Sequence, residues 1–240
     1  MGLFKRNPFG HILFLKTWLI RIAGIITHRR YRSFNELHIE GSEIIRSLPD
    51  TNVLFISNHQ TYFADVVAMF HVFNASLKGR ENNIKNVLYL WNPKLNLYYV
   101  AAKETMQEGL LPRILAYAGA ITVERTWRAK GKDVTEKKEV NPNDTENIKI
   151  ALEDGWVITF PQGTTRSFKP VRKGTAHIIL QHKPIVVPIV IDGFRRSFDR
   201  KGLRIKKKGI LQSFVIKEPL KIDYENATVD EVVETIEFAI

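Results

Sequence analysis

Short apolar segments alternate with amphipathic ones along most of this chain, and that alternation restricts the folds available to it. The apolar segments are five to eight residues long, which is the length of a buried strand. They cover residues 52–57, 85–91, 97–102, 120–124, 156–160, 185–191 and 210–217. The candidate helices cover residues 65–78, 106–118, 144–154, 174–182 and 228–238. Strands that alternate with helices predict an α/β fold with a largely parallel central sheet flanked by helices.

Capping residues and a proline give further detail on three of these elements. Asp144 and Gly155 are typical of the start and the end of a helix, and Thr228 with Glu231 predicts a capping box on the last helix. Pro188 stands inside an otherwise apolar strand. Because proline cannot donate a hydrogen bond to a neighbouring strand, this segment is predicted to be an edge strand or to carry a bulge.

The composition is that of an ordinary globular protein, with 44% hydrophobic and 25% charged residues in a chain of 240. This length suits one core domain plus an appendage. The chain has no cysteine, which excludes disulfides, a thiolate nucleophile and a thiolate metal site. Its net charge of +11 attracts anions, so nucleic acid, anionic lipid head groups and acidic carrier proteins are all candidate partners. The run Lys206-Lys207-Lys208 is interpreted as a solvated basic turn.

The N-terminal segment points to a membrane surface. Residues 9–27 are rich in Ile, Leu, Phe and Trp, and a cluster of arginines follows them. Basic residues inside the segment argue against a signal peptide and against a simple membrane span. On a helical wheel Thr17, Arg21, Gly24 and His28 share one side and leave a broad apolar side, which is typical of a helix lying in the membrane interface. A tilted single span and a buried helix are the alternatives.

His59 and Asp65 follow the first apolar strand. His59 lies where a strand ends, which is where open α/β sheets collect their reactive groups. An acid six positions further on could orient the imidazole and leave its other nitrogen free to act as a base. On a regular helix the two side chains would point about 120° apart, so a contact between them requires an irregular turn. Taken alone, the pair also fits a solvated loop histidine.

Two further strand ends carry suggestive residues. Arg125 follows the strand at 120–124, and the segment 161–167 reads Pro-Gln-Gly-Thr-Thr-Arg-Ser. The backbone amides and the guanidinium of that segment could hold a phosphate. The alternatives are a surface ion pair for Arg125 and a proline-glycine turn with incidental polar residues for 161–167.

Taken in order, four segments resemble the motifs of the glycerolipid acyltransferase family, which includes the lysophosphatidic acid acyltransferases. They are Asn58-His59 with Asp65, Gly119 through Arg125, Phe160 through Arg166, and Val187-Pro188-Ile189. The resemblance runs from about residue 50 to residue 195. Two features differ from the family pattern. Five residues separate His59 from Asp65 where four are usual, and the third motif has Gln162 in place of glutamate and one extra threonine.

The resemblance implies an O-acyltransferase of phospholipid biosynthesis, with amphipathic membrane-anchoring helices in residues 1–40 and an acyltransferase domain in residues 41–240. An acyl group would pass from acyl-CoA or acyl-carrier protein to the free hydroxyl of a lyso-glycerolipid, giving phosphatidic acid if the acceptor is 1-acylglycerol 3-phosphate. His59 would be the general base and Asp65 its partner. The substrate-binding residues would be Asn58, Lys103, Arg125, Gln162, Gly163, Thr164, Thr165 and Arg166. No metal or other cofactor is expected.

Two alternatives are open. The acceptor could be a lyso-lipid without phosphate, such as a lyso-aminolipid, or the protein could be a basic membrane-binding module without catalysis. No nucleic-acid-binding motif is evident, and no serine elbow points to a hydrolase. The expected location is the cytoplasmic face of the cell membrane, as a peripheral or monotopic protein in contact with anionic lipids.

Overall fold

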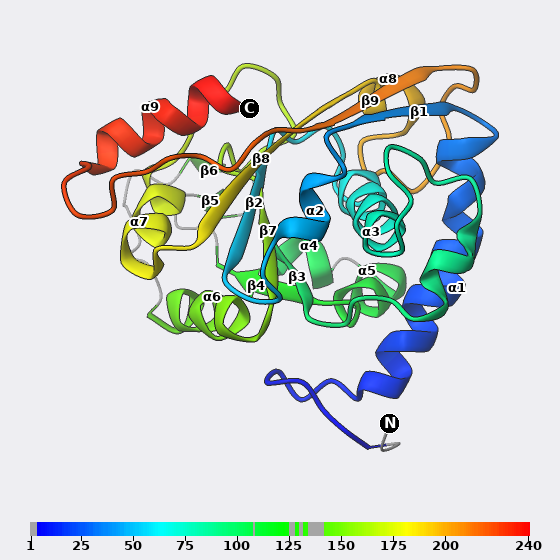
Figure 1. Cartoon of the computed structure of the whole chain (residues 1–240), viewed down its shortest axis with the longest axis horizontal. Helices are drawn as coiled ribbons and strands as arrows, with labels where there is room; N and C mark the ends of the chain where they lie inside the picture. The colour runs from blue at the N-terminus through cyan, green and yellow to red at the C-terminus, as the bar shows by residue number, and fades with distance from the viewer. Residues whose placement is uncertain (1–3, 108, 125–127, 130–131, 134–141) are drawn as a thin grey trace.

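A seven-stranded sheet forms the centre of the protein in this computed structural model (Figure 1), which describes residues 4–107, 109–124, 128–129, 132–133 and 142–240. Its strands, in spatial order, are β1 (Glu36–Glu40), β9 (Leu211–Ile216), β8 (Ile185–Asp192), β2 (Val53–Ser57), β7 (Trp156–Thr159), β3 (Leu97–Ala102) and β4 (Ala120–Val123). Only the β8–β9 pair among these neighbours is antiparallel. The predicted largely parallel α/β sheet is therefore confirmed. A separate short pair joins β5 (Arg128–Ala129) to β6 (Lys132–Asp133).

Both faces of the sheet are covered, and β2 shows why. All five of its residues are buried. Successive side chains of a strand point to opposite faces, so Val53 and Phe55 enter one core while Leu54 and Ile56 enter the other. This explains why a central strand appears in the sequence as an unbroken apolar run.

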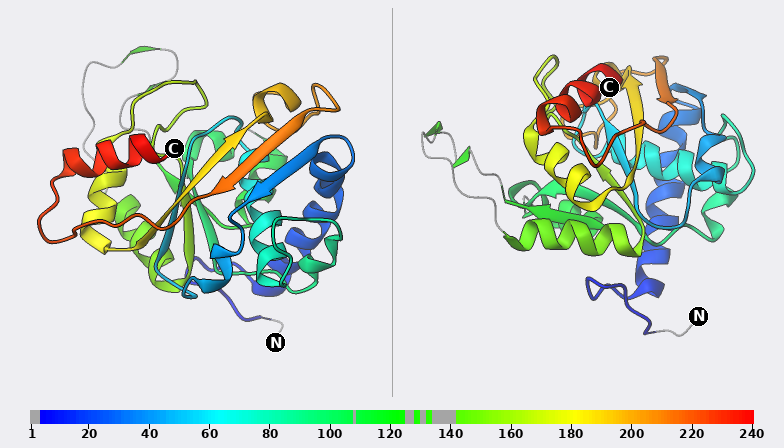
Figure 2. Two further views of the ribbon diagram at one scale, coloured as in Figure 1. Left: turned by 45° about the horizontal axis from the view of Figure 1, so that its top comes forward. Right: turned by 60° about the vertical axis from the view of Figure 1, so that its left-hand side comes forward.

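The helices form two layers, which Figure 2 shows on opposite sides of the sheet. One layer contains α1 (Leu13–Arg32), α3 (Ala64–Leu77) and the 3₁₀ helix η1 (Val87–Trp91). The other contains α6 (Pro142–Asp154), α7 (Lys173–His182) and α9 (Val229–Ala239). Four short helices complete the chain: α2 (Ile44–Ser47), α4 (Lys103–Gln107), α5 (Leu110–Ala116) and α8 (Phe194–Ser197).

Most predicted elements are present, with some differences. The capping box on α9 is confirmed, because the Thr228 hydroxyl accepts from the Glu231 N–H and the Glu231 carboxylate accepts from the Thr228 N–H. The strand predicted at 85–91 is wrong, since residues 87–91 form η1. The single helix predicted at 106–118 is instead the pair α4 and α5. β1 was not predicted.

Pro188 lies in an interior strand, so the predicted edge position is wrong. β8 pairs with β2 on one side and β9 on the other, in regular register. The Pro188 carbonyl accepts from the Lys217 N–H, so the missing proline donor faces the β9 side as well. The β8–β9 register begins at Ile189 opposite Ile216, so Pro188 faces Lys217 just beyond it and this pair forms one hydrogen bond in place of two.

α1 lies against the domain with its more polar side inward. Its buried residues are Lys16, Ile20, Gly24 and Tyr31. The polar stripe predicted from the helical wheel contacts η1 and the segment before it, because Arg21 donates to the Trp91 carbonyl and the His28 ring bonds the Ile84 carbonyl. The outward side carries apolar residues that include Trp18, Ile22, Ile25 and Ile26. No helix in the described parts of the chain has both the length and the apolar character needed to cross a membrane.

Candidate active site

The parallel strands bring several polar segments to one edge of the sheet. β8, β2, β7, β3 and β4 all run in the same direction, so their carboxyl ends lie side by side. The segments that follow β2, β7 and β8 carry His59, the 160–166 turn and Arg195, respectively. This is the edge at which open α/β sheets bind their ligands.

His59 and Asp65 are in contact. The His59 Nδ1 atom lies 2.9 Å from Asp65 Oδ2, and the two side chains are 13% and 0% exposed. Residues 60–63 form an irregular turn, and Asp65 lies in the first turn of α3. The predicted irregular turn is confirmed.

Three groups of the turn, besides His59, donate hydrogen bonds to Asp65. Its carboxylate accepts from the Gln60 N–H at 2.6 Å, from the Thr61 N–H at 3.0 Å and from the Thr61 hydroxyl at 2.7 Å. A carboxylate in such surroundings is an acceptor only, so the His59 contact requires a proton on Nδ1. The Nε2 atom of His59 is then left with a lone pair that can accept a proton.

Phe160 fixes the plane of the imidazole. The His59 and Phe160 rings are stacked, with centroids 3.9 Å apart and planes 21° apart. Asn58 fixes the strand end beneath it, because its amide donates to the Ile191 carbonyl and its side-chain oxygen accepts from the Ile191 N–H, both at 2.8 Å. The Asn58 amide is therefore engaged by the β8 backbone, and its predicted contact with substrate stays a prediction.

A cleft of about 190 Å³ opens beside His59. Gly163, Thr164 and Thr165 form part of its wall, and Arg172 lies in the same wall. The predicted contact of Gly163, Thr164 and Thr165 with substrate stays a prediction. Gly163 has a left-handed φ of 60°, and a Cβ atom there would lie 2.9 Å from Arg172 Cζ. A larger residue there would adopt a conformation that L residues rarely take and would displace the Arg172 guanidinium.

The acyltransferase family model matches residues 36–192, which is more than half of the chain. The chain belongs to the acyltransferase family. It is 26% identical over 206 residues to a 1-acyl-sn-glycerol-3-phosphate acyltransferase of Cocos nucifera. That match covers 84% of this chain and 56% of the coconut protein, so the chain spans little more than half the length of that relative.

The fold of this family member also resembles a solved structure. The crystal structure of the 1-acyl-sn-glycerophosphate acyltransferase PlsC from Thermotoga maritima aligns with a TM-score of 0.55 at 17% identity. The alignment covers 95% of this chain and 76% of that chain. At this identity the likeness concerns the fold.

The predicted phosphate-binding cations do not form one cluster. Lys103 pairs with Glu124 at 3.0 Å, and both side chains are about half exposed. Arg166 faces a different cleft from the one beside His59. Arg125 lies outside the described residues. Gln162 is half-buried and is not part of either cleft wall.

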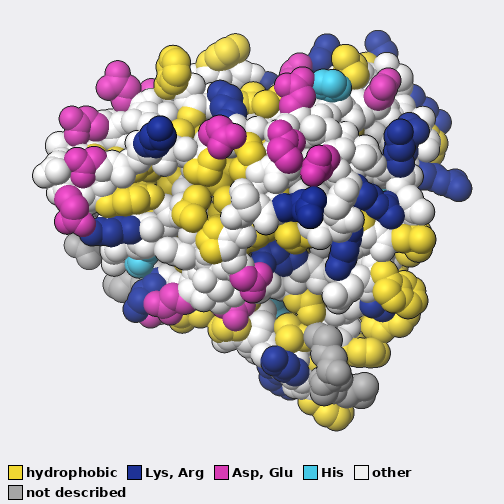
Figure 3. All heavy atoms as spheres, in the orientation of Figure 1, with side chains coloured by type: hydrophobic (Ala, Val, Ile, Leu, Met, Phe, Trp, Pro, Cys, Tyr) yellow, Lys and Arg dark blue, Asp and Glu magenta, His cyan; other side chains and the backbone are white. Residues whose placement is uncertain are grey.

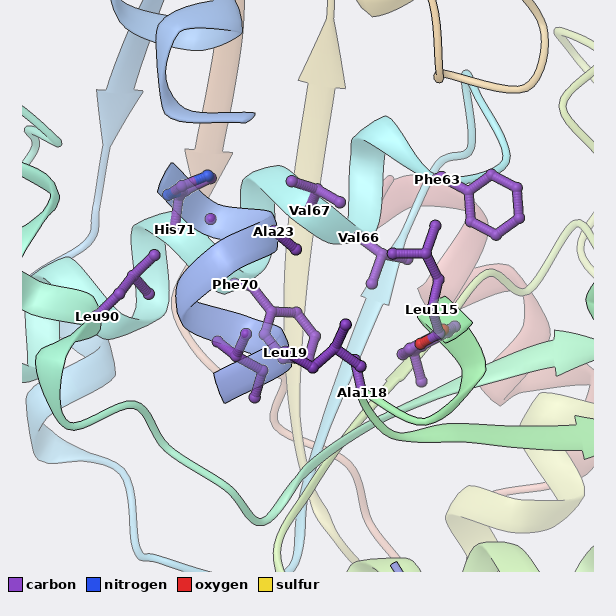
Figure 4. A pocket seen from close by; sticks show the side chains of 13 residues that line it. Leu19, Ala23, Phe63, Val66, Val67, Phe70, His71, Leu90, Leu115 and Ala118 are labelled. Carbon is purple, nitrogen blue, oxygen red and sulfur yellow. The ribbon is translucent and has the colours of Figure 1, made fainter. Parts of the chain in front are cut away.

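An apolar cavity of about 60 Å³ lies between α1, α3 and α5 (Figure 4). Val66 and Tyr99 line both this cavity and the cleft beside His59, so the two spaces lie on either side of these side chains. His71 lies in its wall, bonded to Thr27 and Tyr89, and burial lowers the pKa of His71 to about 3. A neutral, fully bonded imidazole keeps the cavity suited to hydrocarbon.

Sequence reasoning missed four residues that build the site: Gln60, Thr61, Phe160 as a ring partner, and Arg172. The position of Gln60 and Thr61 between His59 and Asp65 was a usable signal, because a turn that brings two side chains together also points its own amides inward. Arg172 gave no such signal, since 11 residues of chain separate it from Phe160. In the described residues, no group of three possible ligands is placed to hold a metal ion.

Proposed function

We propose that this protein transfers a fatty acyl group from an acyl thioester to the free hydroxyl of a lyso-glycerolipid. The acceptor we assign is 1-acylglycerol 3-phosphate, and the product is phosphatidic acid. The observation that carries this proposal is the His59–Asp65 pair, held at 2.9 Å at the mouth of a cleft where the parallel strands end. Membership of the acyltransferase family supports the reaction class.

His59 Nε2 is the general base of the proposed reaction. It takes the proton of the acceptor hydroxyl as that oxygen attacks the thioester carbonyl carbon. Asp65 holds the imidazole and stabilises its charged form. The tetrahedral intermediate then collapses, the carbon–sulfur bond breaks, and the thiolate takes the proton back from His59. Base catalysis of this kind contributes roughly 10²–10⁴-fold to a rate.

The turn after β7 supplies the donors for the oxyanion. Thr164 and Thr165 line the cleft, and their backbone N–H groups donate to no other described residue. Removal of one such donor costs about 10²–10³-fold in known oxyanion holes. Gly163, which precedes them in a left-handed conformation, sets the direction of these two peptide groups.

The apolar cavity is assigned to the acyl chain next to the thioester. Only the side chains of Val66 and Tyr99, which line both spaces, need to move for a chain to reach it from the catalytic cleft. At about 60 Å³ it takes only part of a chain as it stands, and α1 forms one of its walls. Movement of α1 would lengthen it.

We assign the outward side of α1 to a membrane surface and propose that the protein is peripheral or monotopic at the cytoplasmic face. Ile22, Ile25 and Ile26 are 54%, 60% and 64% exposed there, and Leu88 and Trp91 of η1 are also exposed. Figure 3 shows Lys and Arg side chains over the upper right of the molecule and hydrophobic ones at its right edge, where α1 lies. An apolar stripe beside basic residues is typical of interfacial binding to anionic lipids.

The test is acyl transfer by the purified full chain. It is offered palmitoyl-CoA or palmitoyl-acyl-carrier protein with a panel of lyso-lipids, and products are identified by mass spectrometry. The expected product is phosphatidic acid. His59→Ala should abolish turnover and Asp65→Asn should lower it at least 10²-fold, whereas His38→Ala, at an exposed histidine on β1, should not. Near-normal rates in the His59 variant, or product from a lyso-aminolipid alone, would refute the proposal.

A further inference from the structure

A second, wider cleft lies on the far side of the 163–167 turn. It has a volume of about 640 Å³. Thr165 lines both clefts, and Gln60, which lines the second, directly follows His59. The second cleft is therefore a neighbour of the reaction centre, separated from it by the turn after β7.

The connection from β8 to β9 builds most of this second cleft. Its cationic lining residues are Arg166 from the turn and Arg195, Arg200 and Lys206 from that connection. Asp199 is the one carboxylate in the wall, and it accepts from the backbone N–H groups of Leu203 and Arg204 at 2.9 and 3.0 Å. Four cations thus face the cleft against one carboxylate, whose Oδ1 atom already accepts two backbone hydrogen bonds.

Arg195 makes this wall a fixed structure. Its guanidinium donates to the Ser167 hydroxyl and to the Thr165 carbonyl, so the connection is joined to the catalytic turn. Its backbone N–H donates to the Gln60 side chain at 3.0 Å, and that side chain also donates to Ile191 and Asp192 at the end of β8. The residue after the catalytic histidine therefore holds the connection in place.

Three of the cations are available to a ligand. Within the described residues, Arg166, Arg200 and Lys206 form no ion pair. The Arg200 guanidinium lies 5.3 Å from the Tyr62 ring centroid, and Tyr62 is part of the catalytic cleft wall. Arg196, which lies on the same β8–β9 connection, is instead paired with Asp192 at 3.0 Å.

We propose that the second cleft binds the phosphate of the acceptor lipid, with Arg200 and Lys206 of the β8–β9 connection acting beside Arg166. The inference rests on the proposed acyl transfer and adds residues that no motif in the chain indicates. It replaces the predicted cluster of Lys103, Arg125 and Arg166, which the described residues do not form. The proposal gives Lys206, which is exposed as expected for a solvated basic turn, a role in binding the ligand.

Charge favours the acceptor lipid over the acyl donor as the molecule bound in this cleft. A phosphate monoester carries a charge of about −1.5 to −2 at neutral pH and offers three acceptor oxygens. The phosphodiester that joins pantetheine to a carrier protein carries about one negative charge. Four cations against one carboxylate match the monoester better. Each guanidinium group can also donate two parallel hydrogen bonds to a pair of phosphate oxygens.

The test compares two double variants in the full-length protein. Arg200→Ala with Lys206→Ala removes two cleft cations, and Arg204→Ala with Lys207→Ala removes two exposed cations of the same connection that lie outside the cleft. The cleft variant should raise KM for 1-acylglycerol 3-phosphate about tenfold or more, with kcat and the thioester KM little changed. The matched variant should behave as wild type. Glycerol 3-phosphate should inhibit wild type competitively and the cleft variant at least tenfold more weakly.

A phosphate-free acceptor separates this inference from the function it rests on. With 1-acylglycerol as acceptor, wild type and the cleft variant should show equal, low rates. An unchanged KM for the phosphate acceptor in the cleft variant, or a rise confined to the thioester KM, would overturn the assignment while leaving acyl transfer intact. Absence of transfer to any acceptor by wild type would instead refute the proposed function.

Discussion

A carboxylate that must position a histidine gains from having every oxygen bonded, and Asp65 shows how a turn achieves this. The five residues that separate it from His59 contribute two backbone donors and one hydroxyl to it. The additional residue relative to the family pattern therefore does not separate the pair. It allows the turn to fold around the carboxylate and to send the Gln60 side chain towards β8.

Removal of the Thr61 hydroxyl should weaken catalysis without affecting acceptor binding. The hydroxyl is buried and lies 2.7 Å from Asp65 Oδ1. A hydrogen bond to a charged group is worth about 1.5–3 kcal/mol, so Thr61→Val should lower kcat by about tenfold or more and leave KM nearly unchanged. Thr61→Ser should restore most of the rate. Equal losses in the Val and Ser variants would show that the methyl group, and not the hydroxyl, matters.

A side chain at position 163 should disturb the catalytic turn. Gly163→Ala places a Cβ atom 2.9 Å from Arg172 Cζ in a left-handed conformation that itself costs about 1–2 kcal/mol. Acyl transfer should fall at least tenfold, and thermal unfolding should shift downward. Gly174→Ala is the matched control, because nothing lies within 4 Å of a Cβ atom there. Wild-type rates in the Gly163 variant would show that the turn tolerates other conformations.

The sequence was enough to predict the His59–Asp65 contact and the place of residues 163–165 in the cleft. The sequence could not predict which cleft the side chain of Arg166 faces. Arg166 is only one residue beyond Thr165, yet it faces the second cleft, because the turn reverses direction between the two spaces. The direction of a long side chain on an irregular turn depends on contacts from distant segments, here Arg195 on the β8–β9 connection.

At the scale of elements, prediction succeeded where a strand is buried on both faces. β2 and β7 are unbroken buried runs and were found within two residues of their bounds. η1 was mistaken for a strand because its residues are equally apolar, but their burial does not alternate, and the Asn86 side chain caps the segment by accepting from the Leu88 N–H. β1 was missed because its edge position lets Glu36, His38 and Glu40 alternate with the apolar Leu37 and Ile39. The order of the strands depends on pairings between distant segments, which hydrophobic periodicity does not record.

α1 carries a lysine that makes its docking sensitive to pH. Lys16 is fully buried, with Nζ 3.4 Å from the Leu97 carbonyl and 4.7 Å from the Tyr98 ring centroid. Burial lowers the pKa of Lys16 from 10.5 to about 7. Between pH 7 and 10.5 the unfolded chain therefore holds a proton that the folded chain lacks, so stability should rise with pH across this window by up to about 1.4 kcal/mol per unit.

Lys16→Met should remove this dependence. The variant should exceed wild type in unfolding free energy most strongly near pH 7, and the difference should shrink towards pH 10. Denaturant unfolding at pH 7, 8.5 and 10 measures it, with Lys149→Met on the exposed side of α6 as the control. A difference that stays constant over this range would mean that Lys16 keeps an ordinary pKa in the folded protein.

At the scale of the whole molecule, α1 and η1 expose many of the large apolar side chains of the described residues, and α9 lies on the opposite side of the sheet (Figure 2). Ile22→Asp with Ile25→Asp should reduce binding to vesicles of phosphatidylglycerol and phosphatidylethanolamine at least tenfold, because a buried isoleucine contributes about 1.5–3 kcal/mol. Phe238→Asp, at a 93% exposed residue on α9, should leave binding unchanged. Sedimentation with vesicles measures both. Equal losses in the two variants would contradict a defined membrane face.

The direction of β9 has a consequence for how this protein could change over time. Because β9 runs antiparallel to β8, the connection between them leaves and re-enters the sheet at the edge where His59 lies. A parallel β9 would have required the chain to cross to the opposite edge first. The exposed side chains of Arg200 and Lys206 can change without moving the backbone of this connection, which stays joined to the catalytic turn because the Arg200 and Lys201 carbonyls accept from the Tyr62 and Phe63 N–H groups. Preference for an acceptor head group can therefore diverge among descendants while the chemistry stays constant.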